Sequence, residues 1–387
     1  MMTPQFLENP VWGLPIVIYP FFSGLVAGSF VVASLSPLFG LKKFEPVVKL
    51  AAILSFSMLL VAALAPLVDS LQPSRAIIEL YLRDHFPYSA LGVFIIVWTL
   101  YVILMVFEIY YVFRPTNVQR AGLPGLRGSI AGFLTFGNAD LSEDSRKRDK
   151  KALAIIAAIG VVLAFIFHGY VGFIFGAIKA RALWSDPLMP ILFITSALVS
   201  GMAFVILAYV IGFSFYSDKG KVDTEVLDGL GKYLLYAIFF DLFLDLIECL
   251  FKVRAYSSLD VHSGFTRIFG LGGPLAFNYL LLQLILGLIV PAVLLTRPAV
   301  RRSKVLVSIV SALVLIGVYE MRYDTVIGGQ LLPKIGQQGL VVFDAPWIGP
   351  EGILSAIGLF GAALVALFSL GWLLGWENEP DSGSETN

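Results

Sequence analysis

The chain of 387 residues is unusually apolar. Hydrophobic residues make up 58% of it and charged residues 14%, with a mean hydropathy of +0.86, whereas about a quarter of the residues in a soluble protein are charged. Because so few charges cannot cover a water-exposed surface, the composition predicts that lipid surrounds much of the protein. The net charge of zero gives no indication of nucleic-acid binding. The single cysteine, Cys249, excludes internal disulfides and cysteine-ligated clusters.

Nine apolar runs are long enough to cross a bilayer as helices, which takes about 20 residues. They are 14–39, 49–70, 88–113, 152–177, 188–215, 231–250, 274–296, 305–320 and 351–375. The opening MMTPQFLENPVW lacks the basic region and the small-residue cleavage site of a removable signal peptide, so the first span is expected to be kept. The sequence therefore predicts an all-α polytopic membrane protein with about nine transmembrane helices.

The distribution of Lys and Arg predicts the orientation in the membrane. Of the 27 such residues, 18 fall on the side of the connections 40–48, 114–151, 216–230 and 297–304. Cytoplasmic connections are enriched in Lys and Arg, so this side is expected to be cytoplasmic, with the N-terminus outside and the C-terminus inside an inner membrane. The run SEDSRKRDKK at 142–151 is then expected to be a solvated loop that sets the topology.

Two similar segments suggest an internal duplication. SGLVAG occupies 23–28 in the first span, and SALVSG occupies 196–201 in the fifth. An even number of spans separates them, so both copies have the same orientation and predict two four-helix bundles in parallel repeat with a ninth helix appended. Small residues at this spacing also permit close helix packing without any duplication. The predicted divisions are a first bundle at 1–187, a second at 188–320, an outer loop and ninth helix at 321–375, and a disordered polar tail at 376–387.

Three acids in the sixth span are the clearest functional candidates, because an ionisable group in hydrocarbon costs roughly 2.5–3.5 kcal/mol. Asp241, Asp245 and Glu248 follow one another at i, i+4 and i+7, so they share one helix face. All three cannot stay ionised there without partners, since mutual repulsion and desolvation oppose charge. At least one is expected to hold a proton near neutral pH, as a proton relay requires. The alternative is a structural role in which neighbouring Arg or Lys side chains neutralise them.

Further ionisable residues fall in or beside other spans. Asp69 closes the second span, Glu108 lies near the cytoplasmic end of the third, and His168 lies in the outer half of the fourth. Asp69, His168 and Asp245 all fall toward the outer half, which favours a shared polar pocket there. A lone intramembrane histidine is nevertheless often only a hydrogen-bonded structural residue. Arg322, expected just after the eighth span and before a turn at Gly328-Gly329-Gln330, adds a cation on the same side.

Histidine and cysteine are too few for a resident redox centre. A transmembrane b-type haem needs two axial ligands, usually His, but the chain has only His85, His168 and His262, two of which fall in outer loops. The cysteine count excludes iron–sulfur clusters as well. A version of this protein that handles electrons must therefore pass them directly to a partner's cofactor.

Seven stretches distributed from the first span to the last carry a family resemblance. They are VWGLPIVIYPFFSGLVAG (11–28), APLVDSLQP (65–73), DHFPYSALGVF (84–94), FEIYYVF (107–113), HGYVGFIFGAIKARALWSDPLMP (168–190), MRYDTVIGGQLLP (321–333) and APWIGPEG (345–352). In these stretches the chain resembles the membrane subunits of polysulfide-reductase type, the NrfD-like family.

The resemblance implies two four-helix bundles, a quinone or quinol site near the periplasmic face and no cofactor held permanently by the chain. Electrons would pass between menaquinone or another exchangeable quinone and a docked iron–sulfur subunit, behind which lies a catalytic subunit, often with molybdopterin. By position, His168 matches the family's intramembrane histidine and Asp69 the acid that closes the second span. Arg322 and Gln330 match the motif after the eighth span. The acid stripe of the sixth span is denser than the family pattern, which leaves the role of each acid open.

The leading hypothesis is thus a quinone-site subunit of a respiratory oxidoreductase complex. Each quinol hydroxyl needs a proton acceptor, and His168 and Asp69 are predicted to serve. Apolar walls and further hydrogen bonds are predicted to come from Tyr19, Tyr170 and Trp184, besides Arg322 and Gln330.

A proton pathway to the cytoplasm is predicted through Asp241, Asp245, Glu248 and Glu108. His85 and the outer loops 71–87, 251–273 and 321–350 are expected to face the iron–sulfur partner. Two alternatives stay open. One is a secondary transporter, in which repeats and midplane acids serve an ion and a substrate, and the other is a membrane anchor without a quinone site.

Overall fold

The computed structural model describes residues 10–70, 73–74, 88–216, 222–255, 259–334 and 339–376. Its regular structure is helical throughout these ranges, with no strand. Eight helices in this described part are long and apolar enough to cross a membrane, which confirms the prediction of an all-α polytopic membrane protein. The remaining predicted span corresponds to α9 (Thr224–Leu250), which has spanning length but carries the acid stripe.

The other helices of the bundle follow one another in chain order. They are α1 (Leu14–Ser34), α2 (Glu45–Ala62) with α3 (Leu64–Asp69), α5 (Ala90–Arg120), α7 (Glu143–Gly176), α8 (Met189–Ile211), η4 (Phe277–Ile289) with α11 (Val290–Leu295), α13 (Lys304–Tyr323) and α15 (Ile353–Leu374). Shorter helical segments connect or extend them. These are η1 (Lys42–Phe44), α6 (Leu126–Leu134), η2 (Gly212–Tyr216), η3 (Phe251–Ala255), α10 (Leu259–Phe269), α12 (Pro298–Arg302), η5 (Asp324–Gly328) and α14 (Gly329–Leu331).

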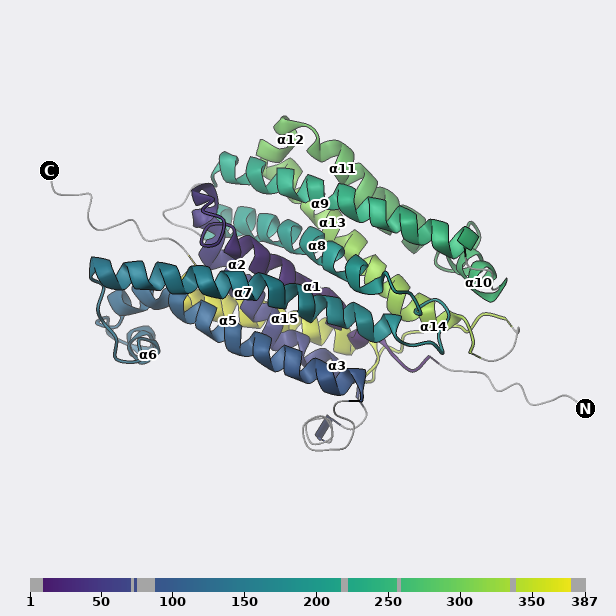
Figure 1. Ribbon diagram of the computed structural model, residues 1–387, viewed down its shortest axis with the longest axis horizontal. Coiled ribbons are helices and arrows are strands. Elements are labelled where there is room, and N and C mark those ends of the chain that lie inside the picture. Colours follow the sequence, from purple (N-terminus) through teal and green to yellow (C-terminus); the bar gives the residue numbers. More distant parts are fainter. Residues whose placement is uncertain are drawn as a thin grey trace, which may run out of the picture.

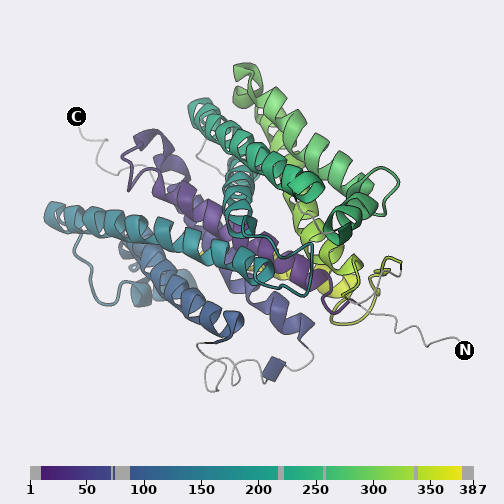
Figure 2. The same cartoon turned by 45° about the vertical axis from the view of Figure 1, so that its right-hand side comes forward.

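The long helices run side by side in two groups (Figures 1 and 2). In the first group, α1, α2, α5 and α7 pack on one another, and in the second, α8 packs on α9 and α13 while α13 packs on η4. The central helices α1 and α8 join the groups, and α15 packs on α1 and α2. Among the candidate spans α1 is the most buried, and α5 and α15 are the least. The division into two repeated bundles at the predicted boundaries stays a prediction.

The two groups meet at a backbone contact between Gly28 of α1 and Gly201 of α8. A Cβ atom added to either glycine would overlap the backbone of the other, so no larger residue fits at this crossing. These glycines occupy the same position in SGLVAG and SALVSG. A two-fold relation between duplicated halves would bring equivalent positions together in this way.

The two ends of the bundle differ. The end that carries the Lys- and Arg-rich connections, which we call the basic end, was predicted to hold a loop and is instead largely helical. This end holds α6 and the start of α7, at the left of Figure 1, and the opposite end holds α10 and α14. Most of 114–151 is helical, so the expectation of a loop is wrong. Ser142 caps α7 by accepting a hydrogen bond from the Ser145 N–H, and acids fill the first turn, where the helix dipole favours them. The run SEDSRKRDKK is therefore the first part of α7.

The predicted turn after the eighth span is also wrong. Helix α13 continues directly into η5 and α14, so Arg322 lies inside a helix and not after it. Gly329 permits this continuation, because the Trp184 side chain lies against its backbone where any Cβ would overlap. The sequence Gly328–Gly329–Gln330 thus forms the last helical turns of this segment.

Several predicted features lie outside the described residues. These are His85, most of the loop 71–87 and the tail from 377 to 387. Trp376, predicted as part of the tail, instead packs edge-on against Phe213 with ring centroids 4.9 Å apart.

Candidate functional site

His168 lies at the centre of the molecule, fully buried in α7. Its Nδ1 is 3.2 Å from the hydroxyl of Ser23 in α1, and its Nε2 is 3.2 Å from Nη2 of Arg322 in α13. A guanidinium group has donors only, so Nε2 must accept and the ring proton must be on Nδ1, from which it donates to Ser23. The contacts therefore fix His168 as one neutral tautomer that bridges the two groups of helices.

Arg322 is a buried cation, and no carboxylate of the described residues lies at ion-pair distance from it. Nη2 also donates to the hydroxyl of Ser196 at 2.6 Å, and the guanidinium carbon lies 4.0 Å from the centre of the Phe193 ring. Nε has no hydrogen-bond partner among the described residues. Burying such a group is expensive when its charge is not fully compensated, so its retention points to a functional role.

The acids of α9 face this arginine. Asp241 and Asp245 both interact electrostatically with Arg322, and Asp241 accepts a hydrogen bond from Thr195 at 2.6 Å. A small cavity lies beside the two acids, lined by residues of α8, α9, η4 and α13 that include Ser196, Asp241 and Asp245. The structure thus brings together His168, Arg322 and two of the predicted acids in one buried polar cluster, which we call the central cluster (Ser23, His168, Ser196, Asp241, Asp245 and Arg322).

A larger cavity adjoins the central cluster toward the opposite end. It is partly open to the surroundings, and Gln283 and Met321 line both cavities. Glu248 and Lys252 form an ion pair of 2.5 Å in its wall. The rest of the lining comes from Leu183, Met189, Phe265, Phe269, Tyr279, Asp324, Thr325 and Gly329.

Three wide-turn π-helical segments build this larger cavity. Lys252 belongs to η3, Tyr279 and Gln283 to η4, and Asp324 and Thr325 to η5. A π turn widens a helix and occurs frequently at functional sites, because it moves side chains away from the regular helical face.

Asp324 is the strongest candidate for contact with a ligand. Its carboxylate is buried in the cavity wall, and neither oxygen has a hydrogen-bond partner among the described residues. Buried carboxylates normally find donors, so these oxygens are available for a ligand. Sequence reasoning missed Asp324 because it placed the end of the span too early. An acid within a continuing helix would have been the signal.

Asp69 lies far from the central cluster. It accepts a hydrogen bond from the backbone N–H of Gly13 at 3.2 Å, whereas His168 contacts Ser23. The stretch of α1 from Gly13 to Ser23 rises about 15 Å, so the structure does not place Asp69 and His168 at the two oxygens of one ring.

Gln330 and Trp184 fasten the N-terminal segment to η5. The amide oxygen of Gln330 accepts from the N–H groups of Val11 and Trp12 at 2.8 and 3.0 Å, and its nitrogen donates to the carbonyls of Trp12 and Val326, both at 3.0 Å. Trp12 stacks on Trp184 with centroids 5.0 Å apart. These contacts already occupy both polar atoms of the Gln330 side chain.

The other predicted residues lie in the first group of helices or outside the described chain. Tyr19 and Tyr170 pack against Phe94 with centroids 6.0 and 5.9 Å apart, and neither lines either cavity. Glu108 is buried in α5, and its Oε2 has no partner among the described residues. Within the described residues no group of three His, Cys, Asp or Glu side chains could hold a metal ion.

The helical bundle with its central cluster defines a polytopic membrane protein with an internal polar site. Comparison with known proteins identifies its family, because the family model described as "Polysulphide reductase, NrfD" matches residues 3–334. The chain belongs to this family, as its resemblance predicted.

The similar proteins carry the names of reductase and oxidoreductase subunits. A selenate reductase subunit of Mesobacillus selenatarsenatis is 32% identical over 328 residues, covering 83% of this chain and 74% of its own length. A putative dimethyl sulfoxide reductase membrane subunit of Halobacterium salinarum is 27% identical, with coverages of 88% and 72%. An Hdr-like menaquinol oxidoreductase integral membrane subunit of Archaeoglobus fulgidus is 23% identical, with coverages of 94% and 86%. The present chain is thus an NrfD-family membrane subunit of reductase type.

Proposed function

We propose that this subunit binds a membrane quinone or quinol in the larger cavity and exchanges its electrons with a docked iron–sulfur subunit. The observation that carries the proposal is the unpartnered carboxylate of Asp324 on a largely apolar cavity next to the central cluster. The name of the Archaeoglobus relative, a menaquinol oxidoreductase subunit, favours menaquinone.

The residues of the cavity suit such a ligand. A bound quinol supplies two electrons and two protons, so each ring hydroxyl needs an acceptor. Asp324 can accept one proton, and Glu248 can accept the other if its ion pair with Lys252 opens. Phe265, Phe269 and other apolar side chains form walls for a ring and its tail.

The central cluster has a supporting role in this proposal. The Nε2 atom of His168 already accepts from Arg322, so the imidazole positions the guanidinium and does not itself take a proton from the ligand. Arg322 then stabilises the carboxylate forms of Asp241 and Asp245 when a proton leaves them.

Protons released at the cavity would pass along α9. Glu248, Asp245 and Asp241 follow one another from the cavity toward the basic end, about one helical turn apart. We assign the basic end to the cytoplasm of a cell inner membrane because Lys and Arg gather there. Glu108 is a further buried acid on the way to this end, on the first group of helices.

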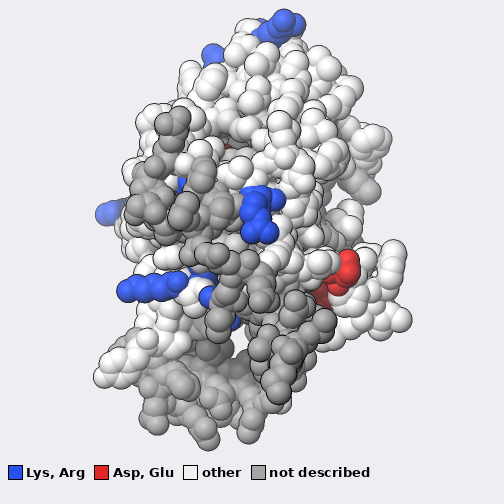
Figure 3. Space-filling view, turned by 90° about the vertical axis from the view of Figure 1, so that its right-hand side faces the viewer, with Lys and Arg blue, Asp and Glu red and all other residues white. Residues whose placement is uncertain are grey.

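The opposite end would receive the iron–sulfur subunit, with a catalytic subunit, often containing molybdopterin, behind it. Figure 3 looks onto this end, where the described surface is mostly uncharged and its Lys and Arg side chains stand apart from one another. Trp347 and Ile348 of the APWIGPEG stretch are 74% and 82% exposed. Exposed aromatic residues of this kind are frequent anchors of protein interfaces.

The test is the substitution Asp324→Asn in the assembled complex, with Asp144→Asn as the control, since Asp144 is exposed at the basic end and lines neither cavity. Oxidation of a soluble quinol analogue and bound quinone content are measured. Asp324→Asn is expected to lower quinol oxidation about 100-fold, the scale of a lost general base, and Asp144→Asn to leave it unchanged. Normal quinol oxidation by the Asp324→Asn complex would refute the assignment.

A further inference from the structure

The connection between α5 and α7 at the basic end exposes a continuous apolar surface. We call residues 121–142 the elbow. Gly128 and Ala131 of α6 are buried, and α6 packs on α5. On the outer side Leu126, Phe133 and Phe136 are 66%, 73% and 69% exposed. Water is an unfavourable solvent for three such side chains in so short a segment.

The apolar surface of the elbow is continuous with the outer face of α5. Phe107, exposed on α5, precedes Tyr110 by one helical turn. The ring of Tyr110 lies 5.7 Å from that of Phe136, which lies 5.9 Å from that of Phe133. We call Phe107, Tyr110, Phe133 and Phe136 the aromatic strip. Because α5 is a candidate span with an exposed apolar face, the aromatic strip extends the lipid-facing surface of α5 to the end of that helix.

Phe136 adopts an unusual backbone conformation that places its ring in this strip. Its φ of 49° is the one positive value among the described non-glycine residues. Bulky residues rarely occupy this region, and their strain persists where surrounding structure holds it. The surrounding structure therefore holds both the backbone conformation of Phe136 and the exposed position of its ring.

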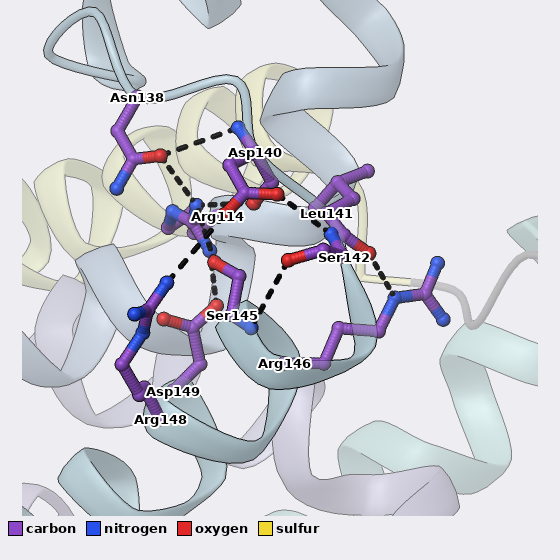
Figure 4. A network of polar contacts seen from close by, with 9 residues as sticks. All are labelled: Arg114, Asn138, Asp140, Leu141, Ser142, Ser145, Arg146, Arg148 and Asp149. Atoms are coloured by element: carbon purple, nitrogen blue, oxygen red, sulfur yellow. Dashed lines mark hydrogen bonds and ion pairs between the residues drawn. The ribbon is translucent and has the colours of Figure 1, made fainter.

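A polar network fixes the elbow to the two long helices (Figure 4). The buried guanidinium of Arg114 in α5 donates to Asn138 at 2.8 Å, to the Asp140 carbonyl at 2.6 Å and to Asp149 of α7. It also contacts Ser145 at 3.2 Å. The exposed apolar surface is thus preformed, and a ligand need not order it.

Basic side chains lie on the helices that carry and adjoin this surface. Arg127 of α6 is exposed and lies over the ring of Trp372 in α15, with its guanidinium carbon 4.9 Å from the ring centroid. Lys150 and Lys151 are exposed just before α7 becomes apolar, and they form no ion pair among the described residues. The nearby acids are largely engaged: Glu143 pairs with Lys147, Asp140 with Arg148 and Asp149 with Arg114, while Asp144 is exposed.

We propose that the elbow is a binding site for anionic phospholipids of the leaflet at the basic end. Acyl chains pack against Phe133 and Phe136, and headgroup phosphates are held by Arg127 of α6 and by Lys150 and Lys151 of α7. An amphipathic segment with basic flanks at a membrane surface binds by this combination of buried apolar area and attraction to anionic lipid.

The test is native mass spectrometry of the purified protein with phosphatidylglycerol or phosphatidylcholine. Wild-type protein is expected to retain phosphatidylglycerol at least fivefold better than phosphatidylcholine. The double variant Lys150→Gln/Lys151→Gln should lose this preference, whereas Arg297→Gln/Lys304→Gln, exposed residues of the same end outside the elbow, should keep it. Equal retention of both lipids by wild type, or equal losses in both variants, would overturn the proposal.

A second measurement identifies what covers the aromatic strip without relying on charge variants. A photoreactive phenylalanine analogue at Phe133 is irradiated in vesicles of phosphatidylglycerol and phosphatidylcholine that contain the whole complex. Lipid adducts enriched in phosphatidylglycerol are expected. Adducts to another protein subunit would mean that the strip is a protein interface, and the lipid site would be abandoned.

Discussion

The two groups of helices differ in helix geometry rather than in how many of their buried polar atoms lack a partner. Among the described residues such atoms occur in both groups, for example in Ser29 and Glu108 of the first and in Arg322 and Asp324 of the second, but those of the first group belong to helices of regular α geometry. In the second, every π-helical segment of the described chain occurs, from η2 to η5, and both cavities lie there. The first group is thus built from regular α-helices, whereas the second combines π-helical segments with both cavities.

The largest effect is expected from removing the cation that joins the two groups. Arg322→Gln takes the charged donor from His168 and the positive charge of Arg322 from Asp241 and Asp245, so that Lys252 remains as the cation acting on Asp245. Breaking a buried charged contact costs about 3–5 kcal/mol, so quinol-linked turnover should fall at least 100-fold.

Arg297→Gln is the control for this arginine, because Arg297 is exposed at the basic end, away from both cavities. Turnover of the assembled complex and its thermal stability are both measured. If Arg322→Gln assembles and turns over normally, the central cluster is not part of the site and the contrast between the groups loses its functional meaning.

The second expected effect concerns the contact between the groups. Gly201→Val would drive a side chain into the backbone at Gly28, and forced overpacking costs about 1–3 kcal/mol or more. A loss of folded subunit or a fall in Tm of several degrees is expected. Gly358→Val in α15, where a Cβ meets nothing within 4 Å, should leave Tm within about a degree. Equal Tm values for both variants would show that α1 and α8 can move apart at this crossing without loss of stability.

A smaller effect separates the acids of the two groups. Asp241→Asn weakens the interaction with Arg322 and is expected to lower quinol-linked electron transfer about tenfold, which corresponds to about 1.4 kcal/mol. Glu45→Gln, at an exposed acid of the first group, should change electron transfer less than twofold. Stopped-flow reduction of the proposed iron–sulfur partner measures both rates, and a Glu45→Gln defect as large as that of Asp241→Asn would remove the distinction.

The smallest effects are expected from the two serines of the central cluster. Ser196→Ala removes the 2.6 Å acceptor of Arg322, and Ser23→Ala removes the acceptor of the His168 ring proton. Each lost hydrogen bond costs about 1 kcal/mol. Ser196→Ala should slow turnover a few-fold because Arg322 faces the acids, whereas Ser23→Ala should mainly lower Tm. If Ser23→Ala slows turnover and Ser196→Ala mainly lowers Tm, the residues that support turnover lie in the first group of helices.

The sequence predicted the helical class, the family and the buried ionisable residues of single spans. His168 and the acids of α9 were recognisable because charge is costly in hydrocarbon, and this argument needs only one helix. Their partners were not recognisable, since the contact of His168 with Arg322 depends on how α7 and α13 pack. Asp69 and His168 were both predicted in the outer half of the membrane. Asp69 ends α3, however, and its carboxylate contacts Gly13 at the start of α1, well away from Ser23.

The remaining predictions failed where the sequence misplaced the ends of helices. Trp184 fills the space beside Gly329, which allows η5 and α14 to continue a helix where glycines predicted a turn. That error moved Asp324 into a loop and hid it as a candidate. At the basic end, the Ser142 cap begins α7 before its charged residues, so a run predicted as a loop became helix.

The touching backbones of Gly28 and Gly201 also restrict how the two halves can move. With no side chain between them, α1 and α8 cannot slide past one another without separating, so relative movement is confined to rocking about this crossing as a pivot. Ser196 lies about 7 Å along α8 from Gly201, so a tilt of about 10° shifts it by only about 1 Å, whereas points farther along the helix shift in proportion to their distance. The bond between Arg322 and Ser196 therefore sits close to the axis of such a motion, and the outer ends of the helices could adjust to a docked partner while the centre keeps its hydrogen bonds.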